Sequence, residues 1–341
     1  MNTRIQKALR GEKTDKTPIW FMRQAGRYLP EYMKIKEKNT FWDMVINPEL
    51  AAEVTLQPIK RYDLDAAIIF SDILTLLYGM GINVSFEHGP PETDKTVRNI
   101  QELRDFKNAT GYEMLHERLP FYKKALKLTR DELPEDKSLI GFAAAPYTIG
   151  SYLLEGQTSK THSLIRAWLF SDKETFAELL DYLADMTIEY CKLQIEAGAD
   201  VIQLFESWGD SIAPDEYRDY IIPHIAKISS ELSKQVPVIF FCRGASIHRD
   251  NLRVLYDKGV SAISIDWRMP IDYFGDLPVQ GNLDPACLWS NPETVARETL
   301  KILEKRAKKG GYIFNLGHGI YPGTPLENVD AMVKTVQEFT P

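Results

Sequence analysis

Two arginines near the start of the chain are the first candidates for chemistry, in the segment Arg23-Gln24-Ala25-Gly26-Arg27. Guanidinium groups bind planar carboxylates through paired, charge-assisted hydrogen bonds, and Gly26 lets the backbone approach a ligand closely. The whole chain carries a formal net charge of −7, so two arginines here would form a locally cationic site. We predict that they bind an acidic ligand, with an ordinary salt bridge to a neighbouring carboxylate as the alternative.

Further candidates follow short apolar runs later in the chain: Asp72, Tyr152, Ser207 and His318. Each has a structural explanation as well as a functional one. Asp72 and Ser207 are of types that often cap the start of a helix, and Tyr152 could simply pack. His318 stands between two glycines, which leave it accessible and favour a functional role.

Eight such apolar runs are the elements that must position these side chains. Continuous rather than alternating apolar character is typical of strands buried on both faces of a parallel sheet. The enzymes of the parallel α/β barrel class carry their sites at the carboxyl ends of the strands, where all of the candidates fall. The runs are residues 18–22, 65–70, 138–143, 200–205, 237–242, 261–266, 277–281 and 311–315.

Other polar residues also follow the runs, and of these we expect Glu206 and Asp266 to be structural. The full set is Ser71, Tyr147, Glu206, Arg243, Asp266, Arg268, Asn282, Asp284 and Asn315.

Helical patterns separate the runs. Ser171 and Glu174 have the spacing of a capping box, which predicts a long helix that ends near Gly198. Further helices are expected at about 214–234, 247–258, 292–308 and 324–338, and the irregular segment 79–110, with its Gly-Pro-Pro, as an insertion. Strand–helix alternation without a linker predicts an α/β fold with a single (β/α)8 TIM-type barrel over residues 1–341. An open doubly wound sheet is the alternative.

Composition narrows the function. The acidic balance argues against nucleic-acid partners and anionic membranes, and no run has the ~20 apolar residues of a spanning helix. The N-terminal segment lacks the apolar core of a signal peptide, and the three cysteines have neither metal-ligand nor redox spacing. These features predict a cytoplasmic protein without disulfides. Phosphate-loop, dinucleotide-fingerprint, zinc-protease and serine-hydrolase motifs are not found.

Six segments together resemble the uroporphyrinogen decarboxylase family of haem-pathway enzymes. The resemblance spans nearly the whole chain, in order and at consistent spacing. The segments are PIWFMRQAGRYLPEY (18–32), LQPIKRYDLDAAIIFSDIL (56–74), APYTIGSYLLEG (145–156), QLFESWGDSIAP (203–214), QGNLDP (280–285) and NLGHGIYPGTP (315–325).

The resemblance implies a homodimeric barrel without metal or organic cofactor that removes the four acetate carboxyls of uroporphyrinogen III. It implies that Arg23, Gln24, Ala25, Gly26 and Arg27 form a substrate-binding loop. Asp72 is implied to be the carboxylate that accepts hydrogen bonds from the pyrrole NH groups. Tyr152, Ser207 and His318 match further substrate-contacting positions, and Trp42 matches an aromatic one. Among these, Asp72, Arg23, Tyr152 and His318 are the catalytic candidates, with the proton donor left open.

Two other functions compete with this prediction. A zinc-dependent corrinoid methyltransferase of the same superfamily would carry a His-x-Cys ligand pair, but here Phe240 precedes Phe241-Cys242 and the histidine is absent. The second is a tetrapyrrole-binding protein that has lost its activity, which the intact set of candidate residues disfavours.

Overall fold

A parallel sheet of seven strands forms the centre of the protein, in a computed structural model that describes residues 2–86 and 90–341. The strands are hydrogen-bonded in the order β1-β4-β5-β6-β7-β8-β9, and all six pairings are parallel. Seven of the predicted apolar runs form these strands. Their bounds are β1 Ala66–Ile68, β4 Ser138–Ala144, β5 Val201–Glu206, β6 Val238–Cys242, β7 Val260–Ile265, β8 Val279–Leu283 and β9 Tyr312–Leu316.

The remaining run, 18–22, is not a regular strand, and that prediction was wrong. It pairs with β9 through a single parallel bridge between Ile19 and Phe314. On its other side the Ile19 carbonyl accepts from the Asp65 backbone N–H at 2.9 Å, while the Asp65 carboxylate takes the Ile19 N–H, also at 2.9 Å. A side chain thus replaces part of the backbone ladder. The run still lies between the two edges of the curled sheet.

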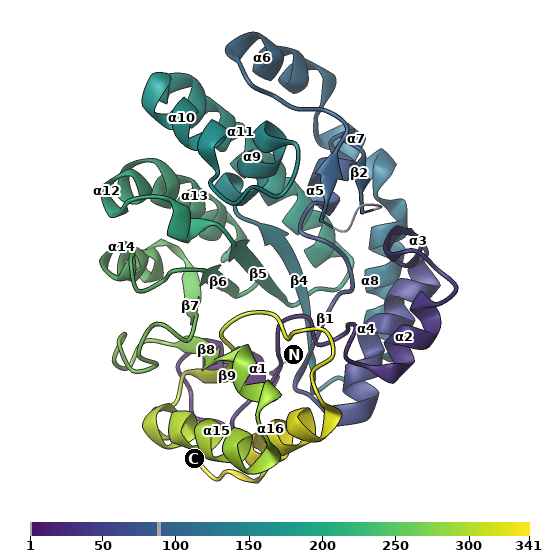
Figure 1. Ribbon diagram of the computed structural model, residues 1–341, viewed down its shortest axis with the longest axis vertical. Helices are drawn as coiled ribbons and strands as arrows, with labels where there is room; N and C mark the ends of the chain where they lie inside the picture. The colour runs from purple at the N-terminus through teal and green to yellow at the C-terminus, as the bar shows by residue number, and fades with distance from the viewer. Residues whose placement is uncertain (1, 87–89) are drawn as a thin grey trace.

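Helices surround the sheet as an outer layer (Figure 1). No helix among the described residues is both long enough and apolar enough to cross a bilayer. The α-helices are α1 Arg4–Leu9, α2 Pro30–Lys36, α3 Phe41–Ile46, α4 Pro48–Tyr62, α5 Thr75–Gly79, α6 Ile100–Ala109, α7 Tyr112–Arg118, α8 Pro120–Glu132, α9 Pro146–Glu155, α10 Ser163–Ser171, α11 Lys173–Glu196, α12 Pro214–Glu216, α13 Ile222–Leu232, α14 Arg249–Arg253, α15 Pro292–Arg306 and α16 Leu326–Glu338. Shorter turns are the 3₁₀ segments η1 Gly209–Ser211, η3 Val254–Lys258, η4 Pro285–Trp289 and η5 Ala307–Lys309, and the π-helical segment η2 Tyr217–Ile221.

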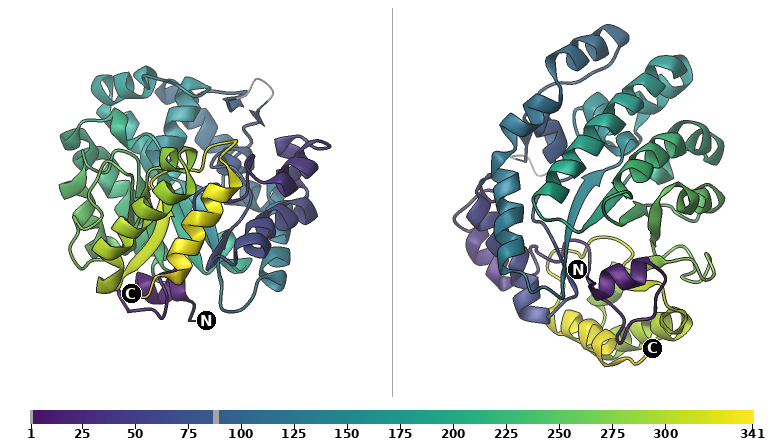
Figure 2. Two further views of the ribbon diagram at one scale, coloured as in Figure 1. Left: turned by 60° about the horizontal axis from the view of Figure 1, so that its bottom comes forward. Right: turned by 180° about the vertical axis from the view of Figure 1, so that it is seen from behind.

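Two apolar cores lie on the two faces of the curled sheet, because successive side chains of a strand point to opposite faces. The larger core packs the outer face against the helices. The smaller one, here called the inner core, fills the inside of the curl. It consists of Ile5, Ala8, Leu9, Trp20, Met22, Ala66, Ile140, Val201, Ile239, Phe241, Ala262 and Ile313, with Ile68 and Phe205 against it. Helix α1 supplies three of these residues and so lies against the inside of the curl (Figure 2).

Two local predictions need correction. Helix α11 is capped by Asp172, whose side chain accepts from the Thr175 backbone N–H, because Ser171 already belongs to the last turn of α10. Its predicted end is confirmed, since Gly198 follows the C-cap with φ +111. The connection between β7 and β8 consists of turns, so strand–helix alternation fails at 266–278. The insertion contains the hairpin β2 Val84–Ser85 and β3 Glu92–Thr93; the glycine of its Gly-Pro-Pro lies outside the described residues.

Candidate active site

A cavity of about 560 Å³ opens at the carboxyl ends of the strands. Residues from β1, β4, β5 and β6 and from the segments after 18–22 and after β9 form its walls. All nine residues that the sequence indicated for substrate binding line it: Arg23, Gln24, Ala25, Gly26, Arg27, Asp72, Tyr152, Ser207 and His318. The convergence follows from the topology, because parallel strands bring their carboxyl ends to one edge.

Arg23 enters the cavity from a strained backbone. Its φ is +63°, in the left-handed region that costs a non-glycine residue roughly 1–2 kcal/mol. Its side chain runs across Gly319, where an added Cβ would come within 2.4 Å of the Arg23 Cδ. The glycine after His318 therefore creates the space that the arginine occupies. Strain of this kind is often concentrated at functional positions.

The rest of the loop is held by hydrogen bonds between side-chain and backbone groups at Gln24. Its side-chain amide donates to the Ala66 carbonyl at 3.0 Å and accepts from the Phe21 N–H at 3.3 Å, and its own carbonyl accepts from the Tyr28 hydroxyl at 2.7 Å. Gln24 is fully buried. Its amide is thus committed to the protein, so Gln24 shapes the loop that presents the two arginines.

Positive charge gathers at the cavity without acidic partners. Arg23 and Arg27 are exposed, and Lys36 at the end of α2 is half-buried. In the part of the chain that the structure describes, none of these three cations forms an ion pair. Among the described residues that line the cavity, Asp72 is the one carboxylate. The alternative of a salt bridge for the two arginines therefore finds no partner among residues 2–86 and 90–341. A cavity lined by three cations and one carboxylate suits a polyanionic ligand.

Asp72 lies where β1 leads into α5. One carboxylate oxygen accepts from the Leu74 N–H at 2.8 Å. Burial raises the pKa of Asp72 to about 6, although the Leu74 hydrogen bond and the charge of Arg23 both lower it. At pH 7 the group is therefore mainly ionised, at an electrostatic cost to the fold.

Tyr152 and Ser207 approach the cavity from α9 and from the end of β5. Burial raises the pKa of Tyr152, and the charge of Asp72 raises it further, so the hydroxyl keeps its proton at neutral pH. That hydroxyl lies 3.4 Å from the Thr158 hydroxyl. The Ser207 backbone N–H donates to the Thr148 hydroxyl at 2.9 Å.

His318 does not add positive charge to the cavity. Burial lowers its pKa to about 4, and the charges of Arg23 and Arg243 act in the same direction. The imidazole is therefore neutral at pH 7 and can both donate and accept a hydrogen bond. Its ring makes an edge contact with Phe241, with centroids 6.1 Å apart.

Several cavity residues were missed by sequence reasoning. The aromatic ones, Phe41, Phe70, Phe86, Phe142, Phe205 and Phe241, make much of the wall apolar. Phe41 lines the cavity, whereas its neighbour Trp42, which the resemblance implied to be an aromatic contact, packs on Tyr78 with ring centroids 4.9 Å apart. Lys36 was also missed. The one signal for this wall in the sequence was the aromatic match at Trp42, next to Phe41.

Two further arginines at the strand ends are paired with acids. Arg243 Nε lies 3.0 Å from the Asp210 carboxylate, and Arg268 binds Asp266 at 2.6 Å. Asp266 is fully buried and also accepts from the Gly244 N–H at 2.7 Å, in keeping with a structural role. These arginines therefore differ from Arg23 and Arg27, which have free guanidinium groups within the described residues.

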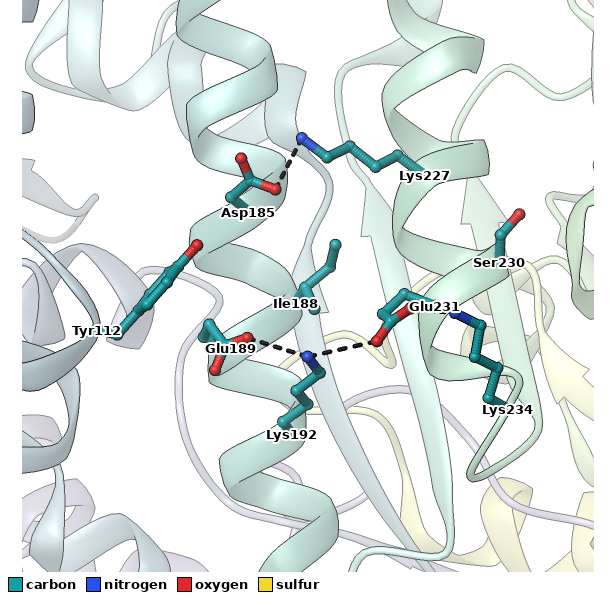
Figure 3. Close-up of a pocket in the computed structure, with 9 residues that line it drawn as sticks. All are labelled: Tyr112, Asp185, Ile188, Glu189, Lys192, Lys227, Ser230, Glu231 and Lys234. Carbon is teal, nitrogen blue, oxygen red and sulfur yellow. Dashed lines mark hydrogen bonds and ion pairs between the residues drawn. The ribbon is translucent and has the colours of Figure 1, made fainter.

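A second depression lies between α11 and α13, and its charged groups neutralise one another (Figure 3). Lys192 lies 3.1 Å from Glu189 and 3.4 Å from Glu231, and Lys227 lies 2.7 Å from Asp185. Such exposed pairs contribute little stability. The depression lacks the unpaired charge that distinguishes the cavity.

Fold and site thus define a parallel α/β protein with a cationic cavity at the carboxyl end of its sheet. The model of the family "Uroporphyrinogen decarboxylase (URO-D)" matches residues 1–339. A uroporphyrinogen decarboxylase from Geotalea uraniireducens is 38% identical over 100% of this chain and 99% of its own length. One from Coxiella burnetii is 41% identical over 99% of this chain and 95% of its own. The chain belongs to the uroporphyrinogen decarboxylase family, which confirms the resemblance found in the sequence.

Solved structures agree on the fold. A methyltransferase from Methanosarcina mazei superposes with a TM-score of 0.79 over 99% of this chain and 98% of its own, at 22% identity. A B12-independent methionine synthase from Shewanella reaches a TM-score of 0.54 at 14% identity, over 96% of this chain and 97% of its own. At these identities the likeness concerns architecture alone.

Proposed function

We propose that the protein is a uroporphyrinogen decarboxylase, which removes the four acetate carboxyls of uroporphyrinogen III to give coproporphyrinogen III and CO₂. The observation that carries the proposal is the cavity, which is lined by three cations, a single carboxylate and several aromatic side chains. The cations suit the eight carboxylates of the substrate, and the aromatic walls suit its pyrrole rings. Full-length relatives named uroporphyrinogen decarboxylase support the same activity.

The reaction needs no electron acceptor other than the substrate itself. Protonation of a pyrrole ring carbon makes a cation, and the adjacent acetate then loses CO₂ as its C–C electron pair neutralises the ring. A second proton adds to the resulting methylene carbon, and the ring carbon releases the first. Each acetate thus consumes one proton and becomes a methyl group. The protein must stabilise the cation and deliver the protons.

We propose that ionised Asp72 stabilises the cation by accepting hydrogen bonds from the pyrrole NH groups. Two opposite charges about 4 Å apart attract by about 4 kcal/mol at an effective dielectric constant near 20. That energy corresponds to about three decades in rate. Arg23 and Arg27 bind substrate carboxylates, and Ser207 and neutral His318 make further hydrogen bonds to them.

The second requirement is a proton donor at the cavity. Tyr152 keeps its hydroxyl proton at neutral pH, and Arg23 carries its charge beside Asp72. We propose these two groups as the candidate donors. A positioned donor contributes about 10²–10⁴-fold to such a step. His318, with its lowered pKa, acts as a neutral hydrogen-bonding group.

Three wider features belong to the same proposal. The run 18–22 is not a regular strand, but it lies between the two edges of the curled sheet, bridged to β9 at Ile19 and bonded to Asp65 before β1. This position supports a closed (β/α)8 TIM-type barrel in place of an open sheet. Exposed Ile247, Trp267 and Trp289, which follow β6, β7 and β8, support a homodimer that covers them. Three free cysteines suit the cytoplasm. Light scattering of the purified protein and fractionation of cells test the last two.

Anaerobic incubation of the metal-depleted protein with uroporphyrinogen III tests the activity, followed by chromatography of the oxidised porphyrins. We expect products with seven, six, five and finally four carboxyl groups. Unchanged substrate from a folded protein would contradict the proposal. Tight porphyrinogen binding without turnover would then favour a binding protein.

The structural likeness to a methyltransferase supports one alternative function, zinc-dependent methyl transfer. The position of the absent histidine is occupied by Phe240, which is fully buried in β6. Burial raises the pKa of the Cys242 thiol, whereas a zinc ligand must be a thiolate. Both observations disfavour this candidate. Zinc bound at one ion per chain after purification would revive it.

A further inference from the structure

A buried carboxylic acid lies behind the cavity wall. Glu206 is the last residue of β5, and its neighbours in sequence, Phe205 and Ser207, both line the cavity. Because side chains alternate along a strand, Glu206 points to the opposite face, where it is fully buried next to α9. It therefore has no access to substrate and can act only through its neighbours.

The hydrogen bonds of Glu206 join two segments that carry cavity residues. The Thr148 hydroxyl of α9 donates to Glu206 Oε1, and the same hydroxyl accepts from the Ser207 backbone N–H at 2.9 Å. The Trp208 N–H donates to Oε1 at 3.3 Å. Glu206 Oε2 is buried and, within the described residues, has no hydrogen-bond partner.

These contacts extend to Tyr152. Thr148 and Tyr152 are four residues apart in α9 and so share one face of the helix. The Trp208 ring lies 6.1 Å from the Tyr152 ring. One carboxyl group therefore ties the helix that carries Tyr152 to the turn that carries Ser207.

We propose that Glu206 is a positioning residue that works as the uncharged acid: it holds Ser207 and Tyr152 in place for decarboxylation, and its ionisation loosens both. The inference rests on the proposed function, and it assigns a role to a residue that has no contact with the cavity. The arrangement of donors and acceptors supports the uncharged form. An ionised group would leave Oε2 as a buried charge without a partner, which is costly.

The surroundings of Glu206 support the same form. Burial raises its pKa to about 8, and the charge of Asp210 acts in the same direction. The acid is therefore protonated at pH 7 and ionises as the pH rises through about 8. The titratable and charged groups packed around it are Asp210 of η1, Cys242 of β6, Tyr217 of η2, Tyr147 of α9 and Arg243, whose guanidinium is paired with Asp210.

The test compares the pH profiles of kcat for wild type, Glu206→Ala and Glu206→Gln. We expect wild-type kcat to fall about tenfold per pH unit above pH 8. Below pH 8 Glu206→Ala should lose at least about tenfold relative to wild type, since no group then bridges the two segments. Glu206→Gln keeps an uncharged acceptor at Oε1, so it should restore turnover at pH 7 and lack the alkaline fall.

An identical alkaline fall in Glu206→Gln would overturn the proposal, and so would a folded Glu206→Gln that is inactive at pH 7. Infrared difference spectra give a readout independent of turnover. At pH 7 the wild type should show a protonated-carboxyl C=O band that Glu206→Gln lacks, and the band should vanish near pH 9; a missing band would overturn the proposal. Thr148→Val should reproduce the loss in Glu206→Ala, whereas Thr148→Ser should not. A wild-type protein that binds uroporphyrinogen III but does not decarboxylate it would refute the proposed function. The infrared result would then decide whether Glu206 is an uncharged acid.

Discussion

Replacement of Asp72 by asparagine should abolish most activity and stabilise the fold at the same time. In the folded protein burial raises the pKa of Asp72 to about 6 from 3.8. At pH 7 the ionised form is therefore disfavoured by about 3 kcal/mol relative to the unfolded chain. Because part of the side chain is open to the cavity, we expect a gain of about 1–3 kcal/mol in the free energy of unfolding. Asparagine Oδ1 can still accept from the Leu74 N–H.

The gain must depend on pH in a definite direction. An acid with a raised folded-state pKa destabilises the protein above that pKa, and its penalty fades as the pH falls toward the value in the unfolded chain. The gain in the free energy of unfolding of Asp72→Asn should therefore be complete above pH 6 and absent below about pH 4. At pH 7 turnover should fall by about three decades relative to wild type, since the neutral amide cannot stabilise the ring cation. The deficit should shrink below about pH 6, where Asp72 of the wild type is itself protonated.

Two assays on the same preparation test this reasoning. Urea unfolding of both proteins at pH 7 and pH 4 gives the stability difference, and anaerobic turnover gives the rate. A variant that is less stable than wild type at pH 7 would refute the buried-charge argument. A variant with near-normal turnover would remove Asp72 from its catalytic role, whatever its stability.

Three other outcomes follow from the site. Arg27→Ala should raise KM about 10–100-fold by removal of a charge-assisted hydrogen bond; an unchanged KM would contradict carboxylate binding. Gly319→Ala should lower kcat by displacing Arg23, whereas Gly111→Ala, with no atom within 4 Å of the added Cβ, should be neutral; equal rates for the two variants would exclude the displacement. The kcat/KM of the wild type should fall as the pH drops through about 6, where Asp72 becomes protonated; an acid limb centred near pH 4 would point to another group.

The sequence predicted the sheet well because its strands are buried on both faces. Seven continuous apolar runs became strands of the parallel sheet. The run 18–22 did not, because the Asp65 side chain takes the backbone N–H of Ile19 that a ladder would use. The hydrophobic pattern of the run cannot reveal this acceptor, because Asp65 lies 46 residues further along the chain. The cap of α11 failed for a local reason: Ser171 and Asp172 are both good caps, and the length of the preceding helix decides between them.

The candidate site was predictable to the extent that it lies at strand ends. Asp72, Ser207 and His318 follow their runs closely, so topology alone brings them together. Lys36 and Phe41 belong to the long connection before β1, and their place at the cavity depends on how α2 and α3 pack. The ionisation states of the site residues could not be predicted from the sequence either. The neutral form of His318 results from burial and nearby arginines, which only the assembled structure displays.

The inner core has a consequence for how such a protein can diversify. Met22, Ile68, Phe205 and Phe241 belong to or pack on that core, and they also line the cavity. Any change of these side chains alters ligand contacts and interior packing together, and large-to-small core changes typically cost about 2–5 kcal/mol. In the loops that line the same cavity, Arg27, Tyr321 and Pro322 are at least partly exposed, so changes there disturb interior packing less. In related proteins, substitutions that change ligand preference should therefore be more frequent in these loops than among the inner-core residues that line the cavity.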